Sequence, residues 1–143
     1  MKIIFDYNRT LFNPDTDSLY QGVLDLLQDL SRYNELFLIS RNEPRRRDRL
    51  EEFGIAKYFK NIAFVEDKTT DIFIKLVGSC KNVFVVGDRV REEIVIGNKL
   101  GFRTIWVRQG KFANELSINP IEQAMFTVKN ITDIQIIISK YEK

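Results

Sequence analysis

The sequence predicts an α/β fold: a three-layer α/β/α sandwich around a Rossmann-like, mostly parallel sheet of five to six strands. Short apolar runs alternate with amphipathic stretches along the whole chain, which is typical of βαβ units. Several of these runs end in a carboxylate or a hydroxyl, as strands do where they present polar groups at one edge of a sheet. The 143 residues show no repeat, low-complexity tract or linker, so one domain is expected over residues 1–143.

The apolar runs are short, rich in Ile, Val and Phe, and bounded by polar or turn-forming residues, which predicts strands. The last run is very short, and it decides whether the sheet has five strands or six. In chain order the predicted strands are Ile3–Phe5, Leu36–Ile39, Ile62–Val65, Asn82–Val86, Arg103–Val107 and Phe126–Val128.

Between the strands, apolar side chains recur at helical spacing. Pro44 suits the first turn of a charged helix, and Gly54 and Gly101 suit helix ends. Gln109–Asn119 is the longest irregular stretch and is expected to be a surface connection or a flexible loop. The predicted helices are Leu19–Leu30, Pro44–Phe53, Thr69–Gly78, Glu92–Leu100 and Asp133–Lys140.

The composition is that of a globular protein. Hydrophobic residues make up 44% and charged residues 29%, and the net charge of +2 favours neither a nucleic-acid nor a membrane partner. Cys80 is the single cysteine, so it cannot form an intramolecular disulfide; it fits a reducing compartment and is expected to pack as a small apolar residue. The chain has neither an apolar run of about 20 residues nor a signal-peptide pattern, so we expect a cytoplasmic protein.

The chain contains no histidine. Ser/His/Asp and Cys/His catalytic sets, and zinc sites that use histidine, are therefore excluded. Any acid, base or nucleophile must be a carboxylate, Lys, Tyr, Ser, Thr or Cys80. A bound metal is expected to be a hard, oxygen-binding cation such as Mg²⁺.

Polar residues end the predicted strands in a fixed order. The first strand leads into the pattern Asp6-x-Asn8-x-Thr10-Leu11, and the residues that follow it along the chain are Ser40 and Arg41, Lys68, Gly87 and Asp88, and Glu93. Together these elements resemble the four motifs of the haloacid dehalogenase superfamily, whose first motif usually reads Asp-x-Asp-Gly-Thr-Leu. The resemblance covers nearly the whole chain.

The chemistry of these positions is coherent by itself. The carboxyl ends of parallel strands meet at one edge, so Asp6 and Asp88 are expected to lie close together. Their mutual repulsion would be relieved by Mg²⁺ and by Lys68. Ser40 and Thr10 supply hydroxyl donors for phosphoryl oxygens. In the simpler interpretation the two aspartates only cap the turns after their strands, but it does not account for Lys68 and Ser40.

The resemblance implies a magnesium-dependent phosphoric monoester hydrolase. In this mechanism Asp6 attacks phosphorus and forms an aspartyl-phosphate, which water then hydrolyses. Magnesium would be held by Asp6, Asp88 and the main-chain carbonyl of Asn8. The resemblance assigns catalysis to Asp6, Asn8 and Lys68, and substrate binding to Thr10, Ser40, Arg41 and Lys68.

Asn8 occupies the position where the family usually has the aspartate that transfers protons. An amide is not a useful acid or base near neutral pH, so hydrolysis is expected to be slower by about 10²–10⁴-fold. The superfamily's dehalogenases and P-type ATPases also lack an acid at this position, so the absence of the acid does not by itself make the protein inactive. The alternative is a non-catalytic binding module that keeps the metal and anion pocket.

Two other features bear on the substrate. Arg9 replaces the usual glycine of the first motif, and it either clamps an anionic substrate or narrows the entrance. Phe12–Ser18 and Glu66-Asp67 are too short to hold the cap domain of larger members, so the resemblance implies a capless protein with an open crevice. The expected partner is a phosphorylated small molecule or macromolecule; a homo-oligomer is left open.

Two further features have simpler interpretations. Arg45-Arg46-Arg47 lies near Glu51 and Glu52, which favours a solvated helix face over a phosphate-binding surface. Trp106 lies in an apolar run and is expected in the core.

Overall fold

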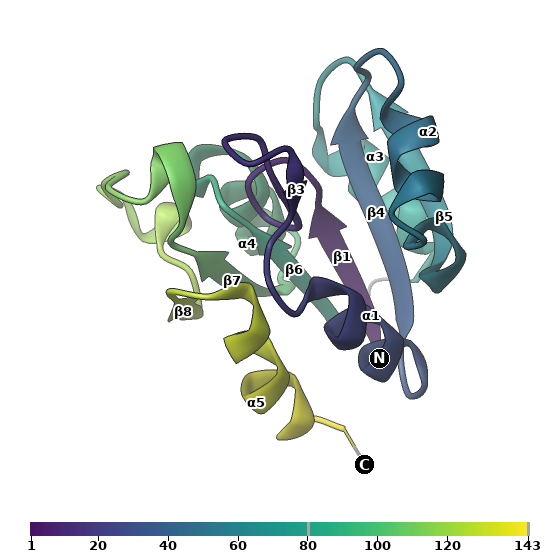
Figure 1. Cartoon of the computed structure of the whole chain (residues 1–143). Coiled ribbons are helices and arrows are strands. Elements are labelled where there is room, and N and C mark those ends of the chain that lie inside the picture. Colours follow the sequence, from purple (N-terminus) through teal and green to yellow (C-terminus); the bar gives the residue numbers. More distant parts are fainter. Residues whose placement is uncertain (80, 143) are drawn as a thin grey trace.

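The computed structural model describes residues 1–79 and 81–142, so the expectation for Cys80 lies outside the described residues. A six-stranded sheet forms the centre of the molecule (Figure 1). Its pairings are all parallel, so the short last run supplies a sixth strand. The strands are β1 (Lys2–Asp6), β4 (Glu35–Arg41), β5 (Phe59–Val65), β6 (Val83–Gly87), β7 (Arg103–Val107) and β8 (Phe126–Val128).

The strand order is β5-β4-β1-β6-β7-β8. The chain builds outward from β1 through β4 and β5, then crosses back to place β6 on the other side of β1. This is the order of the doubly wound Rossmann fold, and it confirms the predicted fold class. The order reverses between β1 and β6, which pair from Lys2 with Val83 to Phe5 with Val86. In such sheets ligands bind beyond the carboxyl ends of the strands at the point of reversal.

Helices cover both faces of the sheet, which confirms three layers. Side chains of α1, α2 and α5 pack in one apolar cluster with the strands, and those of α3 and α4 pack in a second cluster on the opposite face. The helices are α1 (Val23–Ser31), α2 (Arg46–Glu52), α3 (Thr70–Val77), α4 (Val95–Lys99) and α5 (Ile134–Ser139).

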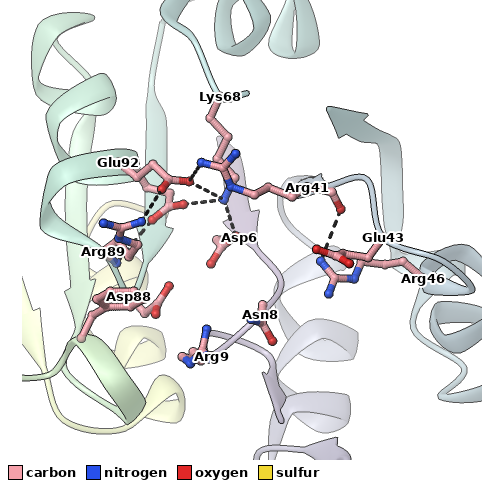
Figure 2. A pocket seen from close by; sticks show the side chains of 12 residues that line it. Asp6, Asn8, Arg9, Arg41, Glu43, Arg46, Lys68, Asp88, Arg89 and Glu92 are labelled. Carbon is pink, nitrogen blue, oxygen red and sulfur yellow. Dashed lines mark hydrogen bonds and ion pairs between the residues drawn. The ribbon is translucent and has the colours of Figure 1, made fainter. Parts of the chain in front are cut away.

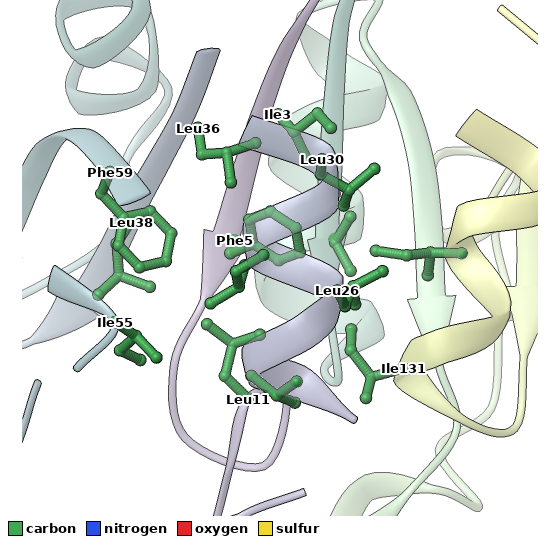
Figure 3. Close-up of a cluster of buried hydrophobic side chains, with 14 of the residues drawn as sticks. Ile3, Phe5, Leu11, Leu26, Leu30, Leu36, Leu38, Ile55, Phe59 and Ile131 are labelled. Atoms are coloured by element: carbon green, nitrogen blue, oxygen red, sulfur yellow. The ribbon is translucent and has the colours of Figure 1, made fainter. Parts of the chain in front are cut away.

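The alternation of β1 shows how the sequence divides the two clusters. Ile3 and Phe5 face the α1 side, whereas Ile4 between them faces α3 and α4, and all three are fully buried. In Figure 3, Leu26 and Leu30 of α1 lie over β1 and its neighbours. Because β1 is buried on both faces, its position is fixed, and so is the position of the residue that ends it.

The start of α1 differs from the prediction. Leu19 fits the helical spacing, but it lies in β3 (Ser18–Leu19), which pairs antiparallel with β2 (Phe12–Asn13). The helix begins only at Val23, because Gly22 has φ 86°, a left-handed conformation that interrupts a helix. Within the described residues, this small hairpin fills the segment between β1 and α1.

Two other helix starts also differ. The charged helix begins at Arg46 rather than Pro44, because Arg45 has φ 62° and lies outside the helix. The helix predicted from Glu92 begins with a π-helical turn, Val90–Ile94, before α4. Short 3₁₀ turns occur at Ala56–Tyr58, Gly110–Phe112, Pro120–Glu122 and Ile131–Asp133. In the described part of the chain, every helix is too short or too polar to span a membrane.

Candidate active site

A polar cavity of about 170 Å³ opens beyond the carboxyl ends of β1, β4 and β6 (Figure 2). It lies at the reversal point of the strand order. Pockets that hold drug-sized ligands measure about 300–1,000 Å³, so this one is sized for a small group. The lining residues are Asp6, Asn8, Arg9, Arg41, Glu43, Arg46, Lys68, Asp88, Arg89, Glu92, Glu93 and Phe112.

Three buried carboxylates form what we call the acidic cluster: Asp6, Asp88 and Glu93. Asp6 ends β1, Asp88 follows β6, and Glu93 lies in the π-helical turn. Their side chains offer oxygen atoms that all lie within 4.8 Å of one another. The residues are only 5%, 3% and 1% exposed. The structure therefore confirms that the first and fourth sequence elements meet.

Gly87, the last residue of β6, makes room for this cluster. A Cβ atom at Gly87 would lie 2.7 Å from Glu93 Oε2 and 2.8 Å from Glu93 Cβ. These are closer than real Cβ contacts, so any other residue would displace Glu93. The glycine of the Gly87-Asp88 pair is thus explained by the close approach of the π-helical turn to the strand end.

Lys68 is the cation of the acidic cluster. Its Nζ donates to Asp6 Oδ1 and to Glu93 Oε1, both at 2.5 Å, and its side chain is 3% exposed. The local sequence fixes this placement, because Thr69 caps α3 by accepting a hydrogen bond from the amide of Ile72. The helix start therefore holds the preceding residue, Lys68, over the strand ends.

Burial and charge shift the pKa values of these groups. Burial disfavours the charged form of Lys68, but the neighbouring charges of Asp6 and Glu93 outweigh it and raise the pKa of Lys68 above its usual range. Burial, followed by the charges of Asp6 and Glu93, raises the pKa of Asp88 to about 9. Burial and then Asp6 raise the pKa of Glu93 to about 7, although Lys68 opposes the shift. One lysine is thus too little positive charge for three carboxylates.

The acidic cluster fits a divalent cation. It offers only oxygen ligands, within a short distance of one another, and the pKa values of Asp88 and Glu93, raised by burial and by neighbouring carboxylates, show that its carboxylates repel one another. This donor set suits Mg²⁺ or Ca²⁺. Glu93 belongs to the cluster as closely as the two aspartates named from the sequence. Asn8 lines the same cavity, and its main-chain carbonyl as a ligand stays a prediction.

The two predicted hydroxyl donors are engaged by protein groups. The Thr10 hydroxyl donates to Asp6 Oδ2 at 3.2 Å, and the Ser40 hydroxyl donates to the carbonyl of Arg41 at 3.2 Å. Ser40 Oγ also accepts a hydrogen bond from Arg46 at 2.8 Å. Both residues are almost fully buried behind the cavity lining. Their contact with a phosphoryl group stays a prediction.

Four arginines line the mouth of the cavity, and we call them the arginine rim: Arg9, Arg41, Arg46 and Arg89. Glu92 links two of them, because its carboxylate lies 3.2 Å from Arg41 and 2.9 Å from Arg89. Arg41 also donates to the carbonyl of Glu66 at 2.7 Å. In Figure 2 Arg41 reaches across the upper part of the cavity toward Glu92.

The sequence analysis missed several lining residues. Arg46 belongs to the run interpreted as a solvated face; Arg45 and Arg47 are exposed, but Arg46 turns toward Ser40 and lies 5.0 Å from the ring centre of Tyr7. Phe112 and Glu92 carried no motif that could have identified them. Only the position of Glu92, next to Glu93, gave any signal.

Trp106 is buried in the core, as predicted, and it also holds part of the site in place. It is 7% exposed, and its indole Nε1 donates to the main-chain carbonyl of Asp88 at 2.9 Å. The core of the protein therefore anchors the backbone of an acidic-cluster residue.

Sequence comparison identifies the family. The family described as HAD-hydrolase-like matches residues 47–134, which is more than half of the chain. The chain belongs to the HAD-hydrolase-like family. The match includes Lys68, Asp88 and Glu93, whereas Asp6 and Ser40 precede it. No curated protein sequence matches the chain significantly.

Solved structures of HAD proteins share this fold. YfnB of Bacillus subtilis, described as a HAD-hydrolase bound to magnesium, has a TM-score of 0.71 and 18% identity over 84% of this chain and 56% of its own. A HAD phosphatase of Thermococcus onnurineus has a TM-score of 0.71 and 14% identity, over 85% and 58%. The chain thus spans little more than half the length of these two HAD proteins.

A third structure is similar over its full length. A protein of Burkholderia xenovorans described as haloacid dehalogenase-like has a TM-score of 0.81 and 15% identity over 98% of this chain and 97% of its own. At such identities the likeness concerns the fold, and the HAD chain's own residues must carry the argument for its activity.

Proposed function

We propose that this HAD chain is a magnesium-dependent phosphoric monoester hydrolase that acts through an aspartyl-phosphate on Asp6. One observation carries the proposal: Asp6 lies at the reversal point of the sheet, its Oδ1 2.5 Å from Lys68 Nζ, in a cluster of three buried carboxylates whose oxygen atoms could hold a metal ion. The named HAD phosphatase and the magnesium-bound HAD protein among the structural neighbours support it.

The first chemical step belongs to Asp6. Its carboxylate oxygen forms a bond to phosphorus while the bond from phosphorus to the leaving oxygen breaks, and the leaving oxygen takes a proton from water. Bound Mg²⁺ would supply Lewis-acid stabilisation of the phosphoryl charge. Lys68 holds the Asp6 carboxylate in position through its hydrogen bond, and its positive charge offsets the repulsion between that carboxylate and an approaching anion.

The second step regenerates Asp6. A water oxygen attacks phosphorus, the bond between phosphorus and the Asp6 oxygen breaks, and inorganic phosphate leaves. The residue that would take the proton of this water in the family's usual motif is Asn8 here. Because its amide cannot accept a proton near neutral pH, this step is slow by about 10²–10⁴-fold relative to a site with an aspartate.

The proposal includes a capless architecture. The segment between β1 and α1 contains only the hairpin of β2 and β3, and Glu66–Thr69 alone joins β5 to α3. The cavity is therefore open on the side that a cap would cover. We also propose that residues 1–143 form one HAD-like core domain, that the location is cytoplasmic, and that the substrate is a phosphorylated small molecule or macromolecule.

Phosphate release from phenyl phosphate tests this function. We expect slow release by the wild-type protein that requires Mg²⁺, stops on chelation, and is absent in Asp6→Asn. This variant keeps the size of the side chain but removes the nucleophile. Magnesium binding without any phosphate release would instead favour the non-catalytic binding module.

A further inference from the structure

Arg9 has a backbone conformation that favours glycine. Its φ is 60°, in the left-handed region, where a side chain is strained. Two hydrogen bonds hold it there: the Arg9 amide donates to the carbonyl of Phe12 at 2.7 Å, and the Gln109 side chain donates to the carbonyl of Arg9 at 3.2 Å. A strained residue that glycine could replace without strain suggests that its side chain has a function.

The Arg9 guanidinium lines the cavity without a polar partner. Among the described residues, the other four cations of the lining each have a hydrogen bond or ion pair to a protein oxygen: Arg41 and Arg89 with Glu92, Arg46 with Ser40, and Lys68 with Asp6. Arg9 has neither a carboxylate within 4.0 Å nor a side-chain hydrogen bond there. Its donors are available to a ligand.

The ring of Phe112 lies beside this unpaired cation. Arg9 Cζ lies 5.7 Å from the centre of the Phe112 ring, which also carries Arg89 at 4.2 Å. Stacking on a ring leaves the in-plane N–H groups of a guanidinium free to bind an anion. Figure 2 shows Arg9 and Lys68 on opposite sides of Asp6, so the two cations serve different parts of the cavity.

We propose that Arg9 binds a second anionic group, a carboxylate or a phosphate, on the leaving-group part of the substrate. This rests on the proposed function and narrows its substrate class to phosphomonoesters that carry another negative charge. A cavity of about 170 Å³ takes up the phosphoryl group, and the rest of the substrate extends past Arg9 and Phe112 at the mouth. Arg pairs with both carboxylate and phosphate through two parallel hydrogen bonds.

Calorimetric binding of non-hydrolysable phosphonates in the presence of Mg²⁺ tests this proposal independently of turnover. The ligands are phenylphosphonate, 4-carboxyphenylphosphonate and 1,4-phenylenebisphosphonate, which differ only at the far end of the ring. We expect the wild-type protein to bind at least one of the two doubly anionic ligands about tenfold or more tightly than phenylphosphonate, as for one charge-assisted contact. The two arms distinguish a carboxylate from a second phosphate.

Arg9→Gly is the test variant and Arg45→Gly the matched control. Arg45 has nearly the same backbone φ, 62°, but it lies outside the cavity and pairs with Glu52 on the surface. We expect Arg9→Gly to abolish the preference for the second anion and Arg45→Gly to keep it. An equal loss of affinity for all three ligands in Arg9→Gly would overturn the proposal, because Arg9 would then bind the phosphoryl group.

Two other results would also overturn it: no preference for a second anion in the wild-type protein, or binding of none of the three ligands. The outcome is separable from that of the proposed function. A preference that depends on Arg9, without phosphate release from phenyl phosphate or 4-carboxyphenyl phosphate, would support the anion site and reject the hydrolase.

Discussion

The acidic cluster and the arginine rim differ in how the fold holds them. The residues of the acidic cluster follow buried strands or lie in the turn packed against β6, they are at most 5% exposed, and Lys68 joins two of them. The rim comes from loop residues, the end of β4 and the first residue of α2, and its arginines are exposed or half-buried. The sheet and the turn packed against it thus hold the acidic cluster, whereas Arg9, the rim residue proposed to select the substrate, lies in a loop.

Energetics should follow the same division. A buried ion network loses several kcal/mol when one partner is removed, because the remaining charges stay desolvated. Exposed ion pairs contribute about 0–1 kcal/mol. Changes in the acidic cluster should therefore affect both stability and turnover, whereas changes in the rim should act mainly on ligand preference.

The largest expected effect concerns turnover. Asn8→Asp should raise phosphate release from phenyl phosphate by at least tenfold, because a proton-transfer group is typically worth about 10²–10⁴-fold. The matched control is Asn42→Asp, the same change at an exposed position outside the cavity. If Asn8→Asp and Asn42→Asp give equal rates while Asp6→Ala is inactive, the proton comes from another group.

The second prediction compares the two regions directly. Lys68→Met should lower the free energy of unfolding by about 3–5 kcal/mol in the absence of metal, since the carboxylates lose their cation. Arg46→Met should cost about 1 kcal/mol or less, the worth of a hydrogen bond to Ser40. Urea denaturation of both variants measures this. Equal losses of unfolding free energy in the two variants would show that the acidic cluster and the arginine rim contribute equally to stability.

A third prediction concerns the space that Gly87 provides. Gly87→Ala should cost about 1–3 kcal/mol, because the new methyl group overlaps Glu93. In a protein that already carries Glu93→Ala, Gly87→Ala should cost much less, because most of the Glu93 side chain that the new methyl group would overlap is absent. Additive costs in the double variant would mean that Glu93 does not approach Gly87.

The fourth prediction is the pH dependence of the metal-free protein. Folding raises the pKa of Asp88 to about 9 and that of Glu93 to about 7, so the folded state holds protons that the unfolded chain has already released. The free energy of unfolding should therefore fall as pH rises from 6 to 9, by about 1.4 kcal/mol per pH unit for each proton at most. The chain has no histidine, so few other side chains titrate in this range.

Asp88→Asn supplies the control for this effect, and saturating Mg²⁺ supplies another. The variant should have a smaller slope, and Mg²⁺ should remove most of the slope by replacing the protons. A wild-type stability that increases from pH 6 to pH 9 without metal would contradict the charge balance described for the acidic cluster.

The same division explains what could be predicted from the sequence. Asp6, Lys68, Asp88 and Glu93 were identified because they follow the order of the haloacid dehalogenase motifs and lie at the predicted strand ends or just beyond them, and parallel strands bring such residues to one edge. The strands themselves follow from period-two or continuous apolar runs. These signals are local, and the topology then places the residues with little freedom.

The remaining residues depend on details that periodicity does not contain. The charged α2 buries only Leu50, so its sequence does not show which arginine faces the site; the start of the helix at Arg46 decides this. The apolar spacing of Leu19 fits a helix, but the left-handed backbone conformation of Gly22 interrupts a helix at that point. Phe112 lies in a 3₁₀ turn of the long segment between β7 and β8, and no motif in the sequence shows that its ring contacts Arg9 and Arg89.

The central claim is that Asp6 carries the phosphoryl group. The most direct measurement is mass spectrometry of acid-quenched protein after incubation with phenyl phosphate and Mg²⁺. We expect a phosphoryl group on the peptide that contains Asp6, at higher occupancy in the wild-type protein than in Asn8→Asp, because Asn8 slows its hydrolysis. Phosphate release without label on Asp6, or equal labelling of Asp6→Asn, would contradict the account.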